Sequence, residues 1–343
     1  REGSDITDVV EEHFGIKAGA LITLLYFFAI FPILLIYSVA LTNTVSSFME
    51  HQLHMQPPPR AILSFVLILG LLAIVRCGEQ ATVKVMSLLV YPFIVALALL
   101  GLYLVPHWTG GILDSATEVP PASAFLHTLW LAIPVMVFSF NHSPIISAFA
   151  VDQKRRYGAH ADERSGQILR RAHLLMVVMV LFFVFSCVLT LSSAQLAEAK
   201  AQNLSILSYL ANHFSNPTIA FAAPLIAFVA IAKSFLGHYI GASEGLKGII
   251  AKTGARPGAK ALDRVVAALM LVVCWIVATL NPSILGMIES LGGPILAVLL
   301  FLMPMYAIRR VPSMRKYSGA ASNVFVVVVG LVALTSVVYG LVS

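Results

Sequence analysis

The sequence predicts an all-α, polytopic membrane protein, and three observations support this prediction. Of the 343 residues, 59% are hydrophobic and only 11% are charged, whereas soluble globular proteins contain about 25% charged residues. The apolar residues gather in stretches of about 20, the length of a helix that crosses a bilayer. The basic residues lie between alternate stretches, so the net charge of +6 reflects membrane topology rather than nucleic-acid binding.

Nine apolar stretches are candidate spans, and the second of them is the shortest. A tight turn at Asn281-Pro282 separates the seventh from the eighth, because this dipeptide favours a turn and interrupts a helix. Nine spans place the two chain termini on opposite sides of the membrane. The stretches are residues 18–48, 61–77, 84–105, 124–150, 168–191, 218–250, 262–280, 283–308 and 322–343.

The basic residues predict the orientation of these spans. Nineteen of the 22 lysines and arginines lie in every second connection, and cytoplasmic loops carry such an excess. The N-terminus is therefore predicted to be cytoplasmic and Ser343 external. The basic segments are residues 1–17, 76–84, 152–171, 247–264 and 309–316.

Two segments outside the spans are predicted to form surface helices. Residues 5–14 place acidic side chains in a first turn, and Gly15 follows where a helix commonly ends in a glycine. External residues 193–214 carry leucines at helical spacing. We expect this second segment either to cover the outer mouth of the bundle or simply to pack on it.

The fourth span contains a cluster of polar residues between Pro134 and Pro144. Pro144 lacks a backbone N–H and clashes with the carbonyl four residues earlier, so it favours a break in the helix. A broken helix is tolerated in a membrane only where it lines protein or a cavity. Its free N–H groups can bind a carboxylate and its carbonyls an ammonium group. An ordinary proline kink is the alternative. The predicted site residues are Ser139, Phe140, Asn141, His142 and Ser143.

Lys233 is the charge in the sixth span that most requires an explanation. Sixteen uncharged residues precede it and ten follow it, and an ammonium group at that depth is costly unless it faces a cavity or a counter-charge. Gly237 and Gly241 share its helical face and would allow a neighbouring backbone to approach. His238 could relay protons or could make a purely structural hydrogen bond.

Glu289 in the eighth span is a candidate gate residue or counter-charge, with a neutral buried carboxyl group as the alternative. Gly292, Gly293 and Pro294 follow it and should loosen the helix.

The cysteines at 77, 187 and 274 show no metal-ligand spacing and are predicted to be small buried side chains. No nucleophile–base pair or phosphate-binding loop appears, so we expect neither an enzyme nor a cofactor or metal site.

Three segments resemble the hydroxy and aromatic amino acid permease family of the amino acid–polyamine–organocation superfamily. They are FNHSPIISAFA, KSFLGHYIGASEG and NPSILGMIESLGGPILAVLLFLMPMYAI. The resemblance extends to LITLLYFFAIFPILLIYSVALTNTV and VPSMRKYSG and covers essentially the whole chain. It implies a LeuT-like inverted repeat of five plus five helices within an eleven-helix fold. The nine spans would be helices three to eleven of one transporter domain at 1–343, lacking the first two helices and their half of the substrate site.

The resemblance also implies proton-coupled uptake of small hydroxy amino acids across the bacterial inner membrane. L-serine is the expected substrate and L-threonine a second candidate, since the two differ by one methyl group. In sodium-coupled relatives a hydroxyl pair midway along helix eight binds the ion. Lys233 and Ser234 lie at a similar depth here, so the Lys233 ammonium would take the place of that sodium.

Three other functions stay open at this point. A threonine or aromatic amino acid permease of the same family would share these motifs. A channel would need a continuous polar stripe and would give a linear, non-saturating flux. A membrane-embedded interaction protein without transport activity would follow if the first two helices were absent in the cell.

Overall fold

The computed structural model describes residues 6–76, 79–110, 120–214, 216–253, 258–289 and 293–342, and every regular element in these ranges is helical. A helix occurs at each of the nine predicted spans. The long helices are α2 (Ile16–His51), α3 (Arg60–Arg76), α4 (Glu79–Leu104), α6 (Ala122–Ser139), α7 (Ser143–Tyr157), α8 (Ala161–Thr190), α11 (Pro217–Lys252), α12 (Ala259–Leu280) and α16 (Ala321–Val342). Short 3-10 turns are η1 (Val105–His107), η2 (Gly158–His160) and η5 (Pro312–Tyr317).

Seven segments of the described chain are long and apolar enough to cross a membrane. The predicted nine spans are thus only partly supported. Helix α3, in the second span, has 17 residues and falls just short of spanning length. The eighth span is divided into α13 (Ile284–Met287), a π turn at 288–289, α14 (Gly293–Ala297), the π-helix η4 (Val298–Leu302) and α15 (Met303–Arg310).

The interruption of the eighth span agrees with the predicted loosening next to Gly293 and Pro294, although residues 290–292 lie outside the described ranges. The predicted turn before this span is confirmed. Asn281 adopts a left-handed conformation with φ 52° directly after α12. Asparagine tolerates this conformation better than most residues do.

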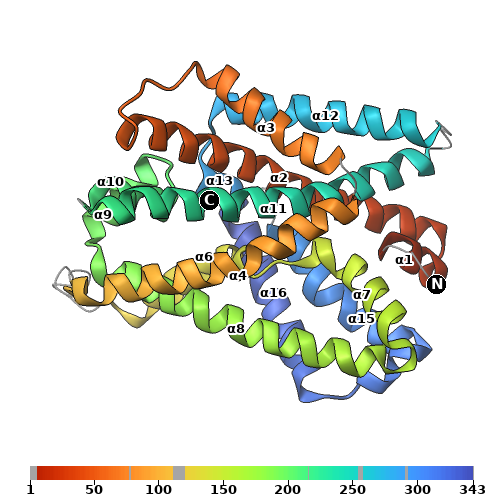
Figure 1. Cartoon of the computed structure of the whole chain (residues 1–343). Helices are drawn as coiled ribbons and strands as arrows, with labels where there is room; N and C mark the ends of the chain where they lie inside the picture. The colour runs from red at the N-terminus through yellow and green to blue at the C-terminus, as the bar shows by residue number, and fades with distance from the viewer. Residues whose placement is uncertain are drawn as a thin grey trace.

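Helices α2 and α11 form the centre of the bundle and lie side by side (Figure 1). Each has 36 residues and continues past an internal proline, Pro32 in α2 and Pro224 in α11. The two helices can approach closely because Gly245 of α11 has no side chain. A Cβ at this position would lie 3.2 Å from the Cα of Phe27 in α2. Most of the buried apolar residues belong to the cluster around these two helices.

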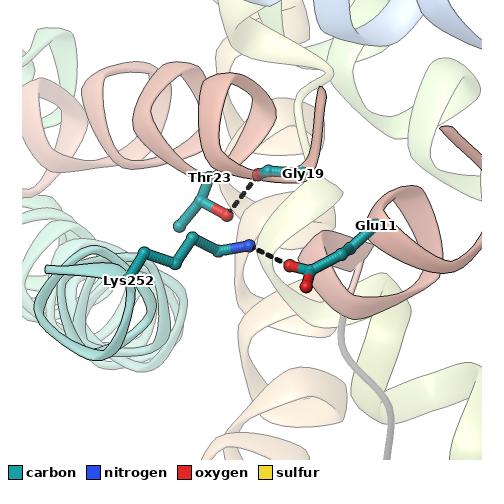
Figure 2. A network of polar contacts seen from close by, with 4 residues as sticks. All are labelled: Glu11, Gly19, Thr23 and Lys252. Carbon is teal, nitrogen blue, oxygen red and sulfur yellow. Dashed lines mark hydrogen bonds and ion pairs between the residues drawn. The ribbon is translucent and has the colours of Figure 1, made fainter. Parts of the chain in front are cut away.

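One end of the bundle is closed by the predicted surface helix, α1 (Ile6–Phe14). Gly15 ends it with φ +86°, as expected for a glycine after a helix. Figure 2 shows how α1 docks: Glu11 forms an ion pair with Lys252 at the end of α11, beside Gly19 of α2. A Cβ at Gly19 would lie 2.6 Å from the Cβ of Glu11, so only glycine permits this approach.

The opposite end carries α9 (Ser193–Ala201) and α10 (Ile206–His213), which confirms a helical segment at 193–214 (Figure 1). Asn203 in the turn between them ties this end together. Its Nδ2 donates to the Asn281 Oδ1 at 3.1 Å and to the Pro282 carbonyl at 3.0 Å, and its Oδ1 accepts from the Ile284 N–H at 2.9 Å. The Asn203 carbonyl accepts from Asn43 of α2 at 2.8 Å.

Candidate functional site

The fourth span is broken where the sequence predicts it. Helix α6 ends at Ser139, α7 begins at Ser143, and residues 140–142 are not helical. In a continuous helix the Phe140 carbonyl would accept from residue 144, but Pro144 has no N–H to donate. The Nδ1 of His142 takes that place, 2.9 Å from the Phe140 oxygen. The predicted break is therefore confirmed, although it is narrower than the non-helical backbone expected near residues 139–144.

Asn141 caps the helix that follows the break. Its Oδ1 accepts hydrogen bonds from the Ser143 N–H at 3.1 Å and from the Ser143 hydroxyl at 2.8 Å. Its Nδ2 is buried and has no hydrogen-bond partner among the described residues. Leaving a buried donor unpaired costs about 1–3 kcal/mol. The bonds from Ser143 to the Asn141 Oδ1 hold this amide group in place. Its Nδ2 can therefore donate to the acceptor of a ligand.

Ser139 differs from its neighbours in the break. Its side chain is exposed, and its hydroxyl donates to the Val135 carbonyl one turn earlier at 2.8 Å. This bond to its own helix satisfies the hydroxyl without a ligand. The role predicted for Ser139 in substrate binding therefore has less structural support than the role of Asn141. Phe140, which directly follows α6, is half-buried.

His142 has a partner on another helix. Its Nε2 lies 3.0 Å from the Nε2 of His173 in α8, and the two ring centroids are 4.7 Å apart. The two residues are 31 positions apart in the sequence. The pair joins the start of α7 to α8 directly at the break.

The glycine face of α11 receives the start of α7, as predicted. A Cβ at Gly241 would lie 3.0 Å from the Pro144 Cβ and equally close to the Tyr26 hydroxyl. A Cβ at Gly237 would meet Met86 of α4 at 3.2 Å and Ile145 of α7 at 3.8 Å. The two glycines therefore bring the break, α4 and the charged segment of α11 together.

Lys233 lies on this face of α11, one turn before Gly237, and is half-buried. Its ammonium group is 5.1 Å from the centroid of the Phe93 ring of α4, a cation–π contact. It forms no ion pair among the described residues, in which four such pairs occur. The structure thus places Lys233 against α4, and among the described residues no carboxylate pairs with it.

Ser234 and His238 meet a tyrosine of α2. The Tyr37 hydroxyl faces the Ser234 side chain, and the Tyr37 ring lies 5.2 Å from the His238 ring. His238 is buried, and its Nδ1 is 2.8 Å from the Ser234 carbonyl. Its Nε2 is buried without a partner among the described atoms. His238 therefore makes the expected structural hydrogen bond and still has one unused ring nitrogen.

A cavity of about 290 Å³ lies between the α9–α10 end of the bundle and the segment before the break. Tyr37 of α2 and Phe138 of α6 form part of its wall, and Phe138 is two residues before Phe140. Ile231 of α11 also borders it, two residues before Lys233. The rest of the wall includes Lys200, Asn203, Leu204, Ser205, Ser283, Ile284, Leu285 and Ile288.

Glu289 is exposed and lies in the π turn that follows α13. Its neighbour Ile288 borders the cavity, but Glu289 itself is not among the lining residues. It forms no ion pair with the described residues, Lys233 included. Its predicted role as a gate or counter-charge stays a prediction.

Comparison with known proteins identifies the relatives of this chain. A family model described as the tryptophan/tyrosine permease family matches residues 1–342. The chain belongs to this family. It is 63% identical to the serine transporter SdaC of Escherichia coli K12, over 99% of this chain and 81% of the relative. It is 62% identical to SdaC of Shigella flexneri with the same coverage. No solved structure matches it.

Membership of a permease family confirms the prediction of a membrane transport protein rather than an enzyme. Two residues of the site in this family member were not predicted from the sequence. One is Tyr37. It and Tyr26 are the two tyrosines in the apolar run LITLLYFFAIFPILLIY, and a hydroxyl group within such a run could have indicated a site residue. His173 follows Arg170 and Arg171 and resembles an interfacial residue, so only the packing of α7 on α8 identifies it.

Proposed function

We propose that the protein is a secondary active transporter that takes up L-serine across the bacterial inner membrane together with protons. L-threonine is the second candidate substrate. The observation that carries the proposal is the break at 140–142, where Asn141 holds a buried unpaired donor. The identity of 63% to a serine transporter supports the choice of serine.

The break suits an amino acid because it offers groups of both polarities. The start of α7 presents the positive end of a helix dipole, which favours a carboxylate, although its Ser143 and Ile145 N–H groups already bond to the Asn141 Oδ1 and the His142 carbonyl. The Asn141 Nδ2 adds a side-chain donor at the same place. The end of α6 presents carbonyl groups that can accept from the substrate ammonium. The cavity along Tyr37 and Phe138 supplies a route from the predicted external side.

Lys233, Ser234 and His238 are the proposed coupling residues. Lys233 pairs with no carboxylate among the described residues, so its charge state affects the groups packed on the same face of α11. Ser234 connects this position to Tyr37, which borders the cavity. Gain or loss of a proton at Lys233 would in this way alter the position of Tyr37 in the cavity wall, and hence the route to the substrate. Glu289 is retained as the candidate gate, since it lies next to the cavity wall.

The proposed arrangement is the LeuT-like one, with α2 as the third and α16 as the eleventh helix of the fold. The succession of lengths supports it: α2, α3 and α4 have 36, 17 and 26 residues, and α11 and α12 have 36 and 22. The α1 end is proposed to face the cytoplasm and the α9–α10 end the outside. A cysteine at His160 should react with an impermeant reagent from the cytoplasm only, and one at Lys200 from the outside only.

Uptake by the full-length protein reconstituted in vesicles tests the proposed function. With an inward proton gradient, radiolabelled L-serine should accumulate saturably, and an excess of L-threonine should compete better than L-tryptophan or L-tyrosine. Asn141→Ala should reduce uptake about tenfold or more, since a hydrogen bond to a charged group contributes about 1.5–3 kcal/mol. Thr128→Ala is the matched control, because that α6 hydroxyl is exposed and bonds only to the Ala124 carbonyl.

Three results would contradict the proposal, each in a different way. A flux that rises linearly with serine concentration would indicate a channel. Preferential uptake of tryptophan or tyrosine would indicate an aromatic amino acid permease. No flux of any of these amino acids by correctly inserted protein would indicate a membrane protein without this transport activity.

A further inference from the structure

The contact between His142 and His173 determines the tautomer of each ring when both are neutral. The His142 Nδ1 faces the Phe140 carbonyl at 2.9 Å, and a carbonyl only accepts, so this nitrogen carries a proton. In a neutral His142 the Nε2 is then an acceptor. His173 must donate its Nε2–H across the 3.0 Å contact. The Nδ1 of His173 is consequently an unprotonated acceptor.

This second acceptor is available for a proton. The Nδ1 atoms of three other helical histidines contact the carbonyl of the residue four positions earlier: His51, His107 and His238. His173 makes no such contact in the described part of the chain, and its side chain is only half-buried. A proton can reach its Nδ1 without breaking an existing hydrogen bond.

We propose that the His142–His173 pair binds one proton in each transport cycle, as a second proton site in addition to Lys233. A proton added at the His173 Nδ1 leaves its Nε2–H bonded to His142, and this bond becomes charge-assisted and stronger. Transfer of the Nε2 proton would move the charge to His142, which then donates from both nitrogens. A second proton would place two N–H groups and two positive charges face to face. The pair therefore accepts one proton and excludes the next.

The position of the pair connects this proton to the substrate site. The inference rests on the proposed function, in which residues 139–143 bind serine. Protonation strengthens the bond that joins the break to α8 and adds positive charge beside the proposed carboxylate position. Serine and the proton then favour each other's binding, and linkage makes the effect reciprocal. Release of the proton toward the cytoplasm would weaken serine binding at the same place.

The charged groups on the neighbouring elements do not neutralise the pair. On α8, Arg170 and Arg171 are exposed one turn before His173 and oppose an added positive charge. On α11, Lys233 lies beside Phe93 and His238 beside Tyr37. On α7, Asp152 pairs with Arg156. Neither imidazole belongs to an ion pair with the described residues.

The test is the number of protons that enter with each serine, measured in vesicles with an internal pH dye and labelled serine. His173→Gln retains an N–H that can donate to the His142 Nε2 but cannot bind a proton. We expect the ratio of protons to serine to fall by about one. The dependence of serine affinity on pH, from about 5.5 to 8, should also flatten. His127→Gln is the matched control, because His127 of α6 contacts only the Trp130 and Tyr339 rings among the described aromatic residues.

An unchanged ratio and an unchanged pH profile in His173→Gln, with serine uptake intact, would overturn the inference and leave serine transport standing. Loss of serine exchange, which moves no net proton, would also overturn it and would assign the pair a structural role. If the parent protein moves serine without protons, the proton site is refuted but not the substrate. Failure of the parent to move serine would refute the proposed function itself.

Discussion

Asn141 at the break and Asn203 at the outer end carry the same amide group but use it differently. Asn203 donates to two oxygens through Nδ2, accepts the Ile284 N–H through Oδ1, and fixes the junction of α12 and α13. Asn141 uses only its oxygen, and its buried Nδ2 has no described partner. A polar network in which the donors and acceptors are bonded to each other, as at Asn203, stabilises the fold. An incompletely used group beside a broken helix indicates a place for a ligand.

The same contrast separates Lys233 from Lys252, and it gives the largest expected effect. Lys252 is paired with Glu11, whereas Lys233 has no carboxylate among the described residues. Lys233→Ala should abolish uphill serine accumulation driven by a pH gradient, while serine exchange continues. Lys233→Arg should fail in the same way, because a guanidinium group does not release its proton.

Accumulation and exchange in vesicles measure both effects, with Lys252→Ala as the matched control. The control should accumulate serine, because an ion pair near the surface contributes only about 0–1 kcal/mol. Normal pH-driven accumulation in Lys233→Ala would show that Lys233 is structural, and His238 or Glu289 would become the first alternatives.

Asn203 should affect stability rather than transport. Asn203→Ala removes the partner of the Ile284 N–H and of the Pro282 carbonyl, while the Asn281 Oδ1 keeps its bond from Arg60, and it should lower the free energy of unfolding by about 1–3 kcal/mol. Asn203→Gly separates this loss from backbone strain, because glycine adopts the φ of 55° at that position without cost. Thermal unfolding in detergent measures both variants. A glycine variant as stable as the parent would show that the amide network contributes nothing.

Tyr37→Phe should have a moderate effect on transport. The variant loses the hydroxyl that faces Ser234 but retains the ring beside His238 and the cavity wall. One neutral hydrogen bond contributes about 0.5–1.5 kcal/mol, so the serine KM should rise about 3- to 10-fold. Tyr103→Phe, which removes an outer-end bond to Asn216, is the control. Equal KM values in the two variants would separate Tyr37 from the substrate route.

Tyr209 should show the smallest effect, and the pH dependence of this effect lies in alkali. Burial, together with the hydrogen bond to Glu198 and its negative charge, raises the pKa of Tyr209 from 10.0 to about 12. A raised folded-state pKa means that this contribution to stability is complete below pH 10 and is lost as the pH rises toward 12. The melting temperature of the parent should fall over this range, and Tyr209→Phe should reduce that fall. Identical alkaline profiles would exclude Tyr209 as the group responsible.

The sequence predicted those features that depend on local chemistry. Pro144 and the polar residues before it predicted the break, and the spacing of Gly237 and Gly241 predicted the close approach on α11. Pro32, Pro134 and Pro224 lie within continuous helices, so proline alone was not sufficient. The break needs side chains such as Asn141 and His142 that replace the lost backbone partners.

Features that depend on packing between distant segments were not predictable in this way. The His142–His173 contact and the meeting of Tyr37 with Ser234 require the positions of α8 and α2 relative to the break. The engagement of the Ser139 hydroxyl by the Val135 carbonyl depends on a rotamer that spacing does not determine. The division of the eighth span into short helices and π turns likewise exceeded the loosening expected from its glycines.

The central claim is that the unpaired Asn141 donor at the break binds serine, and equilibrium binding of labelled L-serine to purified Asn141→Asp protein tests it most directly. Aspartate keeps the oxygen that caps α7 through Ser143 and removes the Nδ2 donor. The account predicts an affinity about tenfold lower or weaker still, equivalent to about 1.4 kcal/mol or more, with the melting temperature of the parent. Parental affinity in a correctly folded Asn141→Asp protein would contradict it.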